Sequence, residues 1–363
     1  MNNFTFSSSP SSSILKWLSD GIISTFTERN FVFRDPSDNQ IKLVFHFLDE
    51  DNVRPYRRKA QATFVVAVLE SKGAPYDIFK EVYPFLIRSL ANHLMYINHR
   101  DEQVDIHFLT PEQGCYSIQY KRGEEEKDFF MKIFQRLQPL STSKLVIDNG
   151  FAEDLPSDKW NGDHVTEALS KSGKRLDKMD LLPAPFPLEH YLNKRDMRHL
   201  NKLYGIGGLS YGNLSARSDQ NHFWMSASGI DKSNMNDVGK DILYIKGYNS
   251  DANQMEVSIP PNVKPKRASV DAIEHWMIYK EHPEVGAIVH IHAWMDDVKA
   301  TEINYPCGTL ELAETVAQLV READNPAETI IGLKNHGLTI TGPSLENIFQ
   351  RIEGKVQRQV PMN

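Results

Sequence analysis

The chain has 363 residues, and its composition and charge exclude several classes of protein. It carries 41 lysines and arginines against 48 aspartates and glutamates, a net charge of -7, which argues against nucleic acid or an anionic membrane as partner. Hydrophobic residues make up 40% of the chain, as in globular proteins with a large core. The two cysteines, Cys115 and Cys307, are too few for a disulfide framework, so we expect a cytoplasmic protein. No apolar run approaches transmembrane length.

Residues 1–30 are predicted to be a flexible tail, because the first 13 residues are rich in serine and lack the regions of a signal peptide. Residues 31–180 are predicted to form a smaller α+β or α/β domain, whose role the sequence does not indicate. Pro84 predicts a kink or a break in its first helix. The pattern of apolar residues predicts strands at 41–48, 62–69, 104–108 and 116–120, and helices at 78–90 and 127–137.

A segment with three prolines, residues 181–187, is expected to separate this domain from a second one at 181–363. The second domain is predicted to be α/β. Its expected helices lie at 188–204, 269–281 and 309–323, and its expected strands lie at 223–226, 242–245, 287–292 and 330–333.

Three histidines in this second domain carry the strongest chemical signal. His290 and His292 alternate in an apolar strand, so both imidazoles point to the same face. His336 follows the apolar run 330–333 and can meet them if the two strands pair. Three imidazoles with an open fourth position are typical of a catalytic metal site. Taken alone, the His-x-His pair is more often part of a surface strand.

Further short motifs accompany the histidines, and each alone is more often an ordinary turn or a helix start. Small Gly/Ser turns can present backbone N–H groups and hydroxyls to an anion. Asp271, at the start of a helix, could serve as a general base or could be only a first-turn acid. The ordered set is Gly212-Asn213-x-Ser215, Ser226-x-Ser228-Gly229, Ser269-x-Asp271, His290-x-His292, Gly308-Thr309-x-Glu311-Leu312-Ala313 and Asn335-His336-Gly337-Leu338.

This order resembles the class II aldolase/adducin family over roughly residue 187 to the C-terminus. The resemblance implies a three-layer α/β/α fold and a divalent metal held by His290, His292 and His336. Zn²⁺ is the expected metal, with Fe²⁺ or Mn²⁺ as alternatives. It further implies Asp271 as the catalytic carboxylate. The residues that match the family's substrate-phosphate cradle are Gly212, Asn213, Ser228, Gly229 and Ser269.

Three departures from the family pattern affect the expected reaction. The family's aldolases carry glutamate where this chain has the shorter Asp271, and Val270 replaces a serine that would contact the phosphate. The segment after His292 is also shorter than the one in which those enzymes hold a tyrosine donated across a subunit interface. Tyr305 is the nearest substitute and is our candidate for that proton donor.

The resemblance therefore implies a metal-dependent lyase acting on a small anionic hydroxy-carbonyl substrate through an enediolate. Aldol cleavage, decarboxylation, epimerisation and dehydration share that intermediate, so the sequence leaves the reaction open. A homotetramer is expected from the family. Two alternatives are a non-haem iron oxygenase on the same fold and a non-catalytic, adducin-like scaffold, although such scaffolds lose the histidines.

Overall fold

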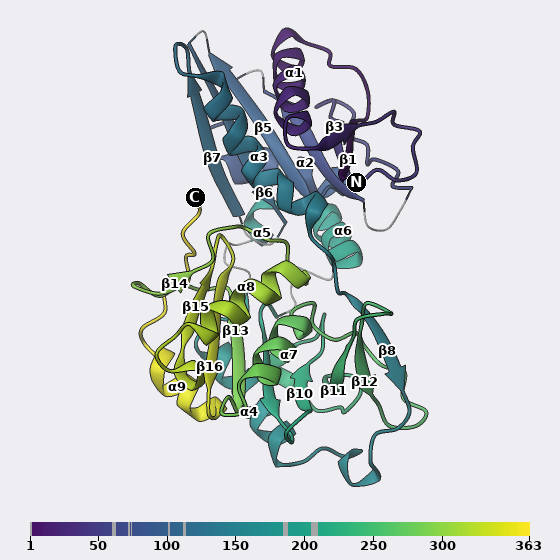
Figure 1. Ribbon diagram of the computed structural model, residues 1–363, viewed down its shortest axis with the longest axis vertical. Coiled ribbons are helices and arrows are strands. Elements are labelled where there is room, and N and C mark those ends of the chain that lie inside the picture. Colours follow the sequence, from purple (N-terminus) through teal and green to yellow (C-terminus); the bar gives the residue numbers. More distant parts are fainter. Residues whose placement is uncertain are drawn as a thin grey trace. The chain divides into compact units, whose positions relative to one another are not determined.

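The computed structural model describes residues 2–59, 63–71, 73, 75–100, 102–111, 114–183, 188–204 and 210–363, with only the backbone for 202–204. The chain divides into two compact units (Figure 1). The first comprises Met1–Thr142, Phe186–Gly207 and Met362–Asn363. The second comprises Ser143–Pro185 and Gly208–Pro361. Part of the proline-rich segment, 184–187, and the glycines at 207 and 208 lie outside the described residues.

The first unit is built on a mixed seven-stranded sheet in the order β2-β1-β3-β4-β5-β6-β7. The pairings from β2 to β5 are parallel, and β6 and β7 add antiparallel strands at one edge. Its elements are β1 (Asn2–Phe6), α1 (Ser13–Thr27), β2 (Phe31–Phe33), β3 (Leu43–Phe47), β4 (Phe64–Glu70), α2 (Ile78–Ser89), β5 (His93–Arg100), β6 (Gln103–Thr110), β7 (Gly114–Lys121), α3 (Glu126–Thr142), α5 (Leu188–Tyr191) and α6 (Lys194–Tyr204).

The predicted flexible tail at residues 1–30 is wrong. Strand β1 lies inside the sheet between β2 and β3, and its Phe4 and Phe6 are buried. Helix α1 follows, capped by the Ser12 hydroxyl, which accepts from the Leu15 backbone N–H at 3.1 Å. The serines that suggested a tail surround this cap, where serine is favoured because its side chain satisfies a free backbone donor.

The predicted boundary between the domains also differs from the structure. Residues 143–185 belong to the second unit, because β8 (Asp148–Ala152) pairs in parallel with β12 (Gln254–Ser258). Residues 186–207, predicted to open the second domain, instead belong to the first unit. The single helix predicted at 188–204 is divided into α5 and α6, since Asn193 accepts from the backbone N–H groups of Arg195 and Asp196 and starts a new helix.

The second unit contains a nine-stranded sheet in the order β14-β15-β16-β13-β9-β10-β11-β12-β8. Most neighbours are antiparallel, and only β8 with β12 and β14 with β15 are parallel. Its other elements are η1 (Ser157–Lys159), α4 (His164–Lys178), β9 (Asn213–Arg217), β10 (Phe223–Ser226), η2 (Lys232–Asn234), β11 (Ile242–Asn249), α7 (Ala272–Glu281), β13 (Ala287–Ile291), β14 (Lys299–Ala300), α8 (Leu310–Arg321), η3 (Pro326–Glu328), β15 (Ile330–Leu333), β16 (Gly337–Gly342) and α9 (Leu345–Ile352).

Helices cover both faces of this sheet. Ser215 of β9 contacts His275 and Tyr279 of α7, so α7 lies on the face that Ser215 points to. Trp224 of β10 points to the other face, where its indole N–H donates to the Asp163 carboxylate at the start of α4. Helix α9 packs on that second face too, since a Cβ at Gly342 would meet Ile348. The predicted three-layer α/β/α architecture is therefore confirmed.

One strand pairing in the second unit differs from the expectation. Strand β15 does not pair with the His-x-His strand β13; it pairs with β16, and β16 in turn pairs with β13. His336 lies in the turn of this β15–β16 hairpin, where its backbone N–H donates to the Leu333 carbonyl at 3.0 Å. In the described part of the chain, no helix has the length and apolar character needed to span a bilayer.

Candidate metal and catalytic site

The strand register brings three polar side chains into one row. His290 of β13 lies directly opposite Asn213 of β9 on one side and Thr339 of β16 on the other. Residues that face each other across paired strands point to the same side of the sheet, here the side covered by α7. Antiparallel pairing of β9, β13 and β16 therefore places residues far apart in sequence in one buried polar row.

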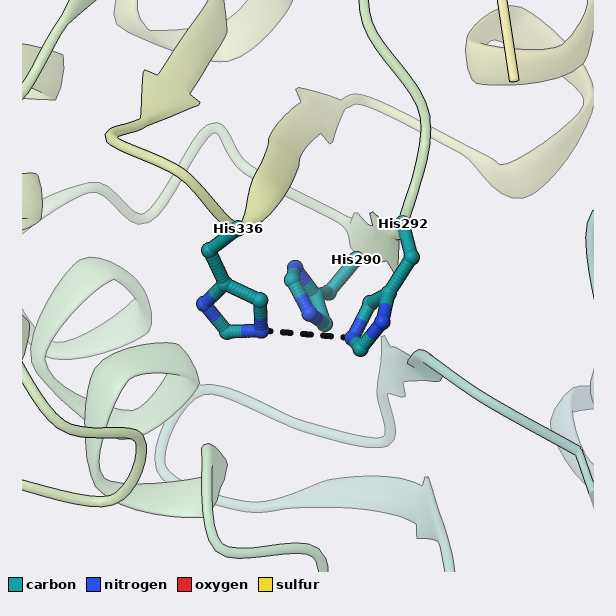
Figure 2. A group of neighbouring side chains, drawn as sticks. All are labelled: His290, His292 and His336. Carbon is teal, nitrogen blue, oxygen red and sulfur yellow. Dashed lines mark hydrogen bonds between the residues drawn. The ribbon is translucent and has the colours of Figure 1, made fainter. Parts of the chain in front are cut away.

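The three histidines converge at the end of this row (Figure 2). The nitrogens that could bind a metal all lie within 4.8 Å of one another, and the Nε2 atoms of His292 and His336 are 3.2 Å apart. Two nitrogens bound to a tetrahedral zinc ion are separated by about 3.3 Å, given the usual zinc–nitrogen distance. The spacing therefore fits a metal site.

The surroundings of the rings fit a metal as well. His290 is buried, and its Nδ1 lies 3.0 Å from the Leu338 carbonyl, which fixes the ring and leaves Nε2 facing the cluster. That Nε2 has no hydrogen-bond partner among the described residues. Burial lowers the pKa of His290, and the pKa values of His292 and His336 lie well below the usual range for the same reason. The imidazoles are therefore neutral, which is the form that binds metals.

Two glycines allow neighbouring segments of the chain to approach the His-x-His strand closely. A Cβ at Gly337, next to His336, would lie 2.1 Å from the Ile291 carbonyl oxygen. A Cβ at Gly212 would lie 2.3 Å from the His290 carbonyl oxygen, and its φ of +65° is itself unfavourable for other residues. This close packing explains why glycine occupies position 212 in the Gly-Asn motif and position 337 in the His-Gly motif.

Asp271 lies directly before α7 and faces the same polar row. Its Oδ2 accepts from the Asn213 side-chain amide at 2.7 Å, while its Oδ1 is buried without a partner in the described chain. Asn213 lies opposite His290 across the paired strands, so the carboxylate that it holds faces the same row, and its negative charge raises the pKa of His290 against the effect of burial. The structure thus brings Asn213, Asp271 and His290 together.

The remaining predicted substrate-binding residues lie in two neighbouring turns. A bridge pairs Ala227 with Ala268, and the Ser228 backbone N–H donates to the Arg267 carbonyl. This pairing places the exposed Ser228–Gly229 turn beside the half-buried Ser269. Tyr305 is half-buried, and in the described part of the chain no hydrogen bond or ring contact joins it to the histidines.

Several residues of this site were not identified from the sequence. The Sγ of Cys307 lies 3.6 Å from the His336 Nε2, and the Tyr211 ring packs edge-on against His292. Lys232 and Glu274 are buried close to Asp271. In the sequence, Lys232 closely follows the Ser-x-Ser-Gly turn. The sequence pattern does not show, however, that this lysine is buried.

Comparison with known proteins agrees with this geometry. Residues 197–355 match the model of the family described as class II aldolase and adducin N-terminal domain. The match covers less than half of the chain, and over these residues the chain is similar to the class II aldolase/adducin family. The three histidines, Asp271 and all the predicted cradle residues fall inside the matched class II aldolase segment.

Relatives with assigned activities align with part of the chain at low identity. An L-fuculose phosphate aldolase of Methanococcus maripaludis is 26% identical over 174 residues, which cover 42% of this chain and 83% of the relative. A methylthioribulose-1-phosphate dehydratase of Citrobacter koseri is 24% identical over 172 residues, covering 39% and 78%.

Solved structures also align with about half of the chain. An L-fuculose 1-phosphate aldolase is 22% identical with a TM-score of 0.35, covering 55% of this chain and 81% of that structure. The N-terminal class II aldolase domain of a Thermoplasma acidophilum protein is 13% identical with a TM-score of 0.34, covering 56% and 94%.

Proposed function

We propose that the protein is a metal-dependent lyase that acts on a small anionic hydroxy-carbonyl compound. The convergence of three neutral, buried or half-buried imidazoles beside a buried carboxylate carries this proposal. His290, His292 and His336 would hold the metal, with Zn²⁺ favoured and Fe²⁺ or Mn²⁺ as alternatives. A scaffold with no catalytic role would have no use for such a donor set.

The proposed mechanism assigns proton transfer to Asp271. When bound, a divalent metal supplies positive charge that stabilises an enediolate, which aldol cleavage, epimerisation, dehydration and decarboxylation have in common. Asn213 orients the Asp271 carboxylate through Oδ2, and the unpartnered Oδ1 is the atom that would take or return the proton. Tyr305 is our candidate for a second proton donor, contributed across a subunit interface as in the family.

The substrate is proposed to carry a phosphate or a carboxylate. The turns formed by Gly212-Asn213, Ser228-Gly229 and Ser269 would contact this group through backbone N–H groups and hydroxyls. The names of two relatives, an L-fuculose phosphate aldolase and a methylthioribulose-1-phosphate dehydratase, support a phosphorylated sugar. A homotetramer is the proposed assembly, and the low cysteine count supports a cytoplasmic location.

The direct test is turnover of phosphorylated ketoses by the purified protein. L-fuculose 1-phosphate and methylthioribulose 1-phosphate would be assayed for carbon–carbon cleavage and for water loss, after loading with Zn²⁺ and after treatment with a chelator. We expect turnover that chelation abolishes and Zn²⁺ restores. A metal-loaded protein that consumes oxygen with Fe²⁺ and shows no lyase activity would contradict the proposal and favour an oxygenase.

A further inference from the structure

Lys232 is a buried cation inside the second unit. It opens the short helix η2, and only 3% of its surface is exposed. Lysine is rarely buried to this degree without a paired carboxylate. Within the described residues no acidic side chain forms an ion pair with it, and burial lowers its pKa to about 8. A lysine kept in such a place needs a reason beyond packing.

The local backbone fixes the direction of this side chain. The Lys232 backbone N–H donates to the Ser210 hydroxyl at 2.8 Å, and Nζ donates to the Ser210 carbonyl at 2.6 Å. Asp231 caps η2 by accepting from the Ser233 N–H. An ammonium group has three donors, and the bond to Ser210 uses one of them. Among the described residues no other acceptor uses the remaining N–H groups, so they can serve a further acceptor.

The electrostatic environment of Lys232 includes residues of the proposed active site. The negative charge of Asp271 acts on Lys232, and the charge of Lys232 acts in turn on His290 and His292. Two buried oxygens of the site, Oδ1 of Asn213 and Oδ1 of Asp271, have no partner among the described residues. Ser210, which accepts from Lys232 Nζ, directly precedes Tyr211 and Gly212 in the chain, and the Tyr211 ring packs against His292. The buried cation therefore lies beside the segment that connects the histidine cluster to Asn213.

We propose that Lys232 binds an anionic oxygen group of the substrate, a phosphate or a carboxylate, next to Asp271 and the histidine cluster. This inference rests on the proposed function and adds a residue that selects for substrate charge. Val270 removes one hydroxyl from the phosphate cradle, and Lys232 supplies a charged donor a short distance along the chain from the Ser228–Gly229 turn. A charge-assisted bond from Lys232 is stronger than the neutral bond that Val270 removes.

Calorimetric titration of the Zn²⁺-loaded protein with inorganic phosphate and, separately, with acetate is the test. We expect Lys232→Met to weaken binding of the preferred anion about tenfold or more, since a bond to a charged group is lost. Lys232→Arg should retain most of the affinity because it keeps the positive charge. Lys240→Met is the matched control, since Lys240 is an exposed lysine whose one ion pair in the described part of the chain is with Asp237. Preference for phosphate or for acetate identifies the group that is recognised.

Lysine labelling of the wild-type protein provides a measurement that does not depend on the folding of a variant. Reductive methylation by formaldehyde, followed peptide by peptide, should slow about tenfold or more at Lys232 when the preferred anion is present, and should not change at Lys240. Equal labelling of Lys232 with and without the anions overturns the proposal. So does a Lys232 that formaldehyde never reaches, because a substrate could not reach it either. If the anion protects Lys232 from labelling but the metal-loaded protein shows no lyase activity, the result would count against the proposed function and not against anion binding by Lys232.

Discussion

At the scale of single residues, the bond from Asn213 to Asp271 determines what the carboxylate can do. One oxygen is held at 2.7 Å by an amide, while the other faces the buried site without a partner in the described chain. In the proposed mechanism, the first oxygen orients the carboxylate and the second transfers the proton. The shorter side chain, compared with the glutamate of the family's aldolases, fits this direct contact with Asn213.

We predict that Asp271→Asn retains metal and fold but lowers turnover by about two to four orders of magnitude, the usual contribution of general base catalysis. The substituted amide keeps the size of the side chain and can still accept from Asn213, so only the base is removed. Asp271→Glu tests whether the site catalyses an aldolase-like reaction or has been rebuilt around the shorter aspartate. Preserved activity would indicate an aldolase-like reaction, and impaired activity would indicate a pocket rebuilt around aspartate. Wild-type turnover by Asp271→Asn would show that the carboxylate is only a helix-start residue.

Glu274 is the second acid on this face of α7. It is buried, and its Oε1 accepts from the Thr339 hydroxyl at 2.6 Å. Burial, and then the charge of Asp271, raise the pKa of Glu274 to about 8 against an ordinary value of 4.5. Glu274 therefore keeps its proton in the folded protein at neutral pH, whereas the unfolded chain loses it.

This difference predicts how stability depends on pH. Between pH 4.5 and 8 the folded state binds more protons at Glu274 than the unfolded state does, so the free energy of unfolding falls as the pH rises. Glu274→Gln should abolish this pH dependence. The free energy of unfolding of the variant, relative to that of the wild type, should therefore increase by up to about 1.4 kcal/mol for each pH unit in that window. Urea unfolding of the metal-free proteins across the window measures it. If the difference in free energy of unfolding between the variant and the wild type does not change with pH, the raised pKa of Glu274 is refuted.

Individual residues of the site were predictable from the sequence only where a short motif contained them. His290, His292 and Asp271 belong to such motifs, and the structure brings them to one face of the sheet. Lys232 and Cys307 were not predicted as site residues, because their proximity to the histidines arises from the packing of distant segments. Their roles depend on tertiary structure, which a local pattern does not contain.

At the scale of elements, the β15–β16 hairpin positions His336. Pairing of β16 with β13 brings the turn of this hairpin to the end of the His-x-His strand. Gly337 makes that pairing close enough, because any side chain there would meet the Ile291 carbonyl oxygen.

We predict that Gly337→Ala destabilises the protein by about 1–3 kcal/mol, the usual cost of overpacking, and weakens metal binding by displacing His336. Gly247→Ala is the matched control in the same sheet, because a Cβ there would make only ordinary contacts at 3.7 Å. Thermal unfolding and metal titration of both variants measure the two effects. Unchanged metal affinity in Gly337→Ala would contradict the role given to the hairpin.

Strong periodic patterns predicted several elements well, and the errors have physical reasons. Strand β10 was predicted with its observed bounds, and α7 and α8 were predicted within three residues at each end. Helix α2 continues through Pro84, so the prediction of a kink or a break is wrong as to the break. Strand β5 was missed because its polar residues, among them Asn98 and His99, interrupt the apolar run, although its buried part lies inside the sheet.

At the scale of the whole molecule, the chain interleaves its two units in sequence. Residues 186–207 return to the first unit between two segments of the second. The predicted division at residue 181 assumed that domains follow one another along the chain. Pairing of β8 with β12 contradicts that assumption, because it joins residues near 150 to the second sheet.

We predict a homotetramer in solution, as expected from the family. Light scattering of the purified protein should give the mass of four 41.5 kDa chains at working concentrations. Tyr305, if it acts across an interface, would then be supplied by a neighbouring subunit, and Tyr305→Phe should lower turnover without loss of metal. A monomer that retains full activity would remove the basis for this role.

Metal content is the measurement that tests the central claim most directly. Elemental analysis of the wild-type protein should find one divalent metal for each chain, and the His290→Ala/His292→Ala double variant should have almost none. His164→Ala is the control, because His164 is exposed at the start of α4 in the same unit and should leave the metal content unchanged. Equal metal content in the wild type and in the double variant would contradict the account.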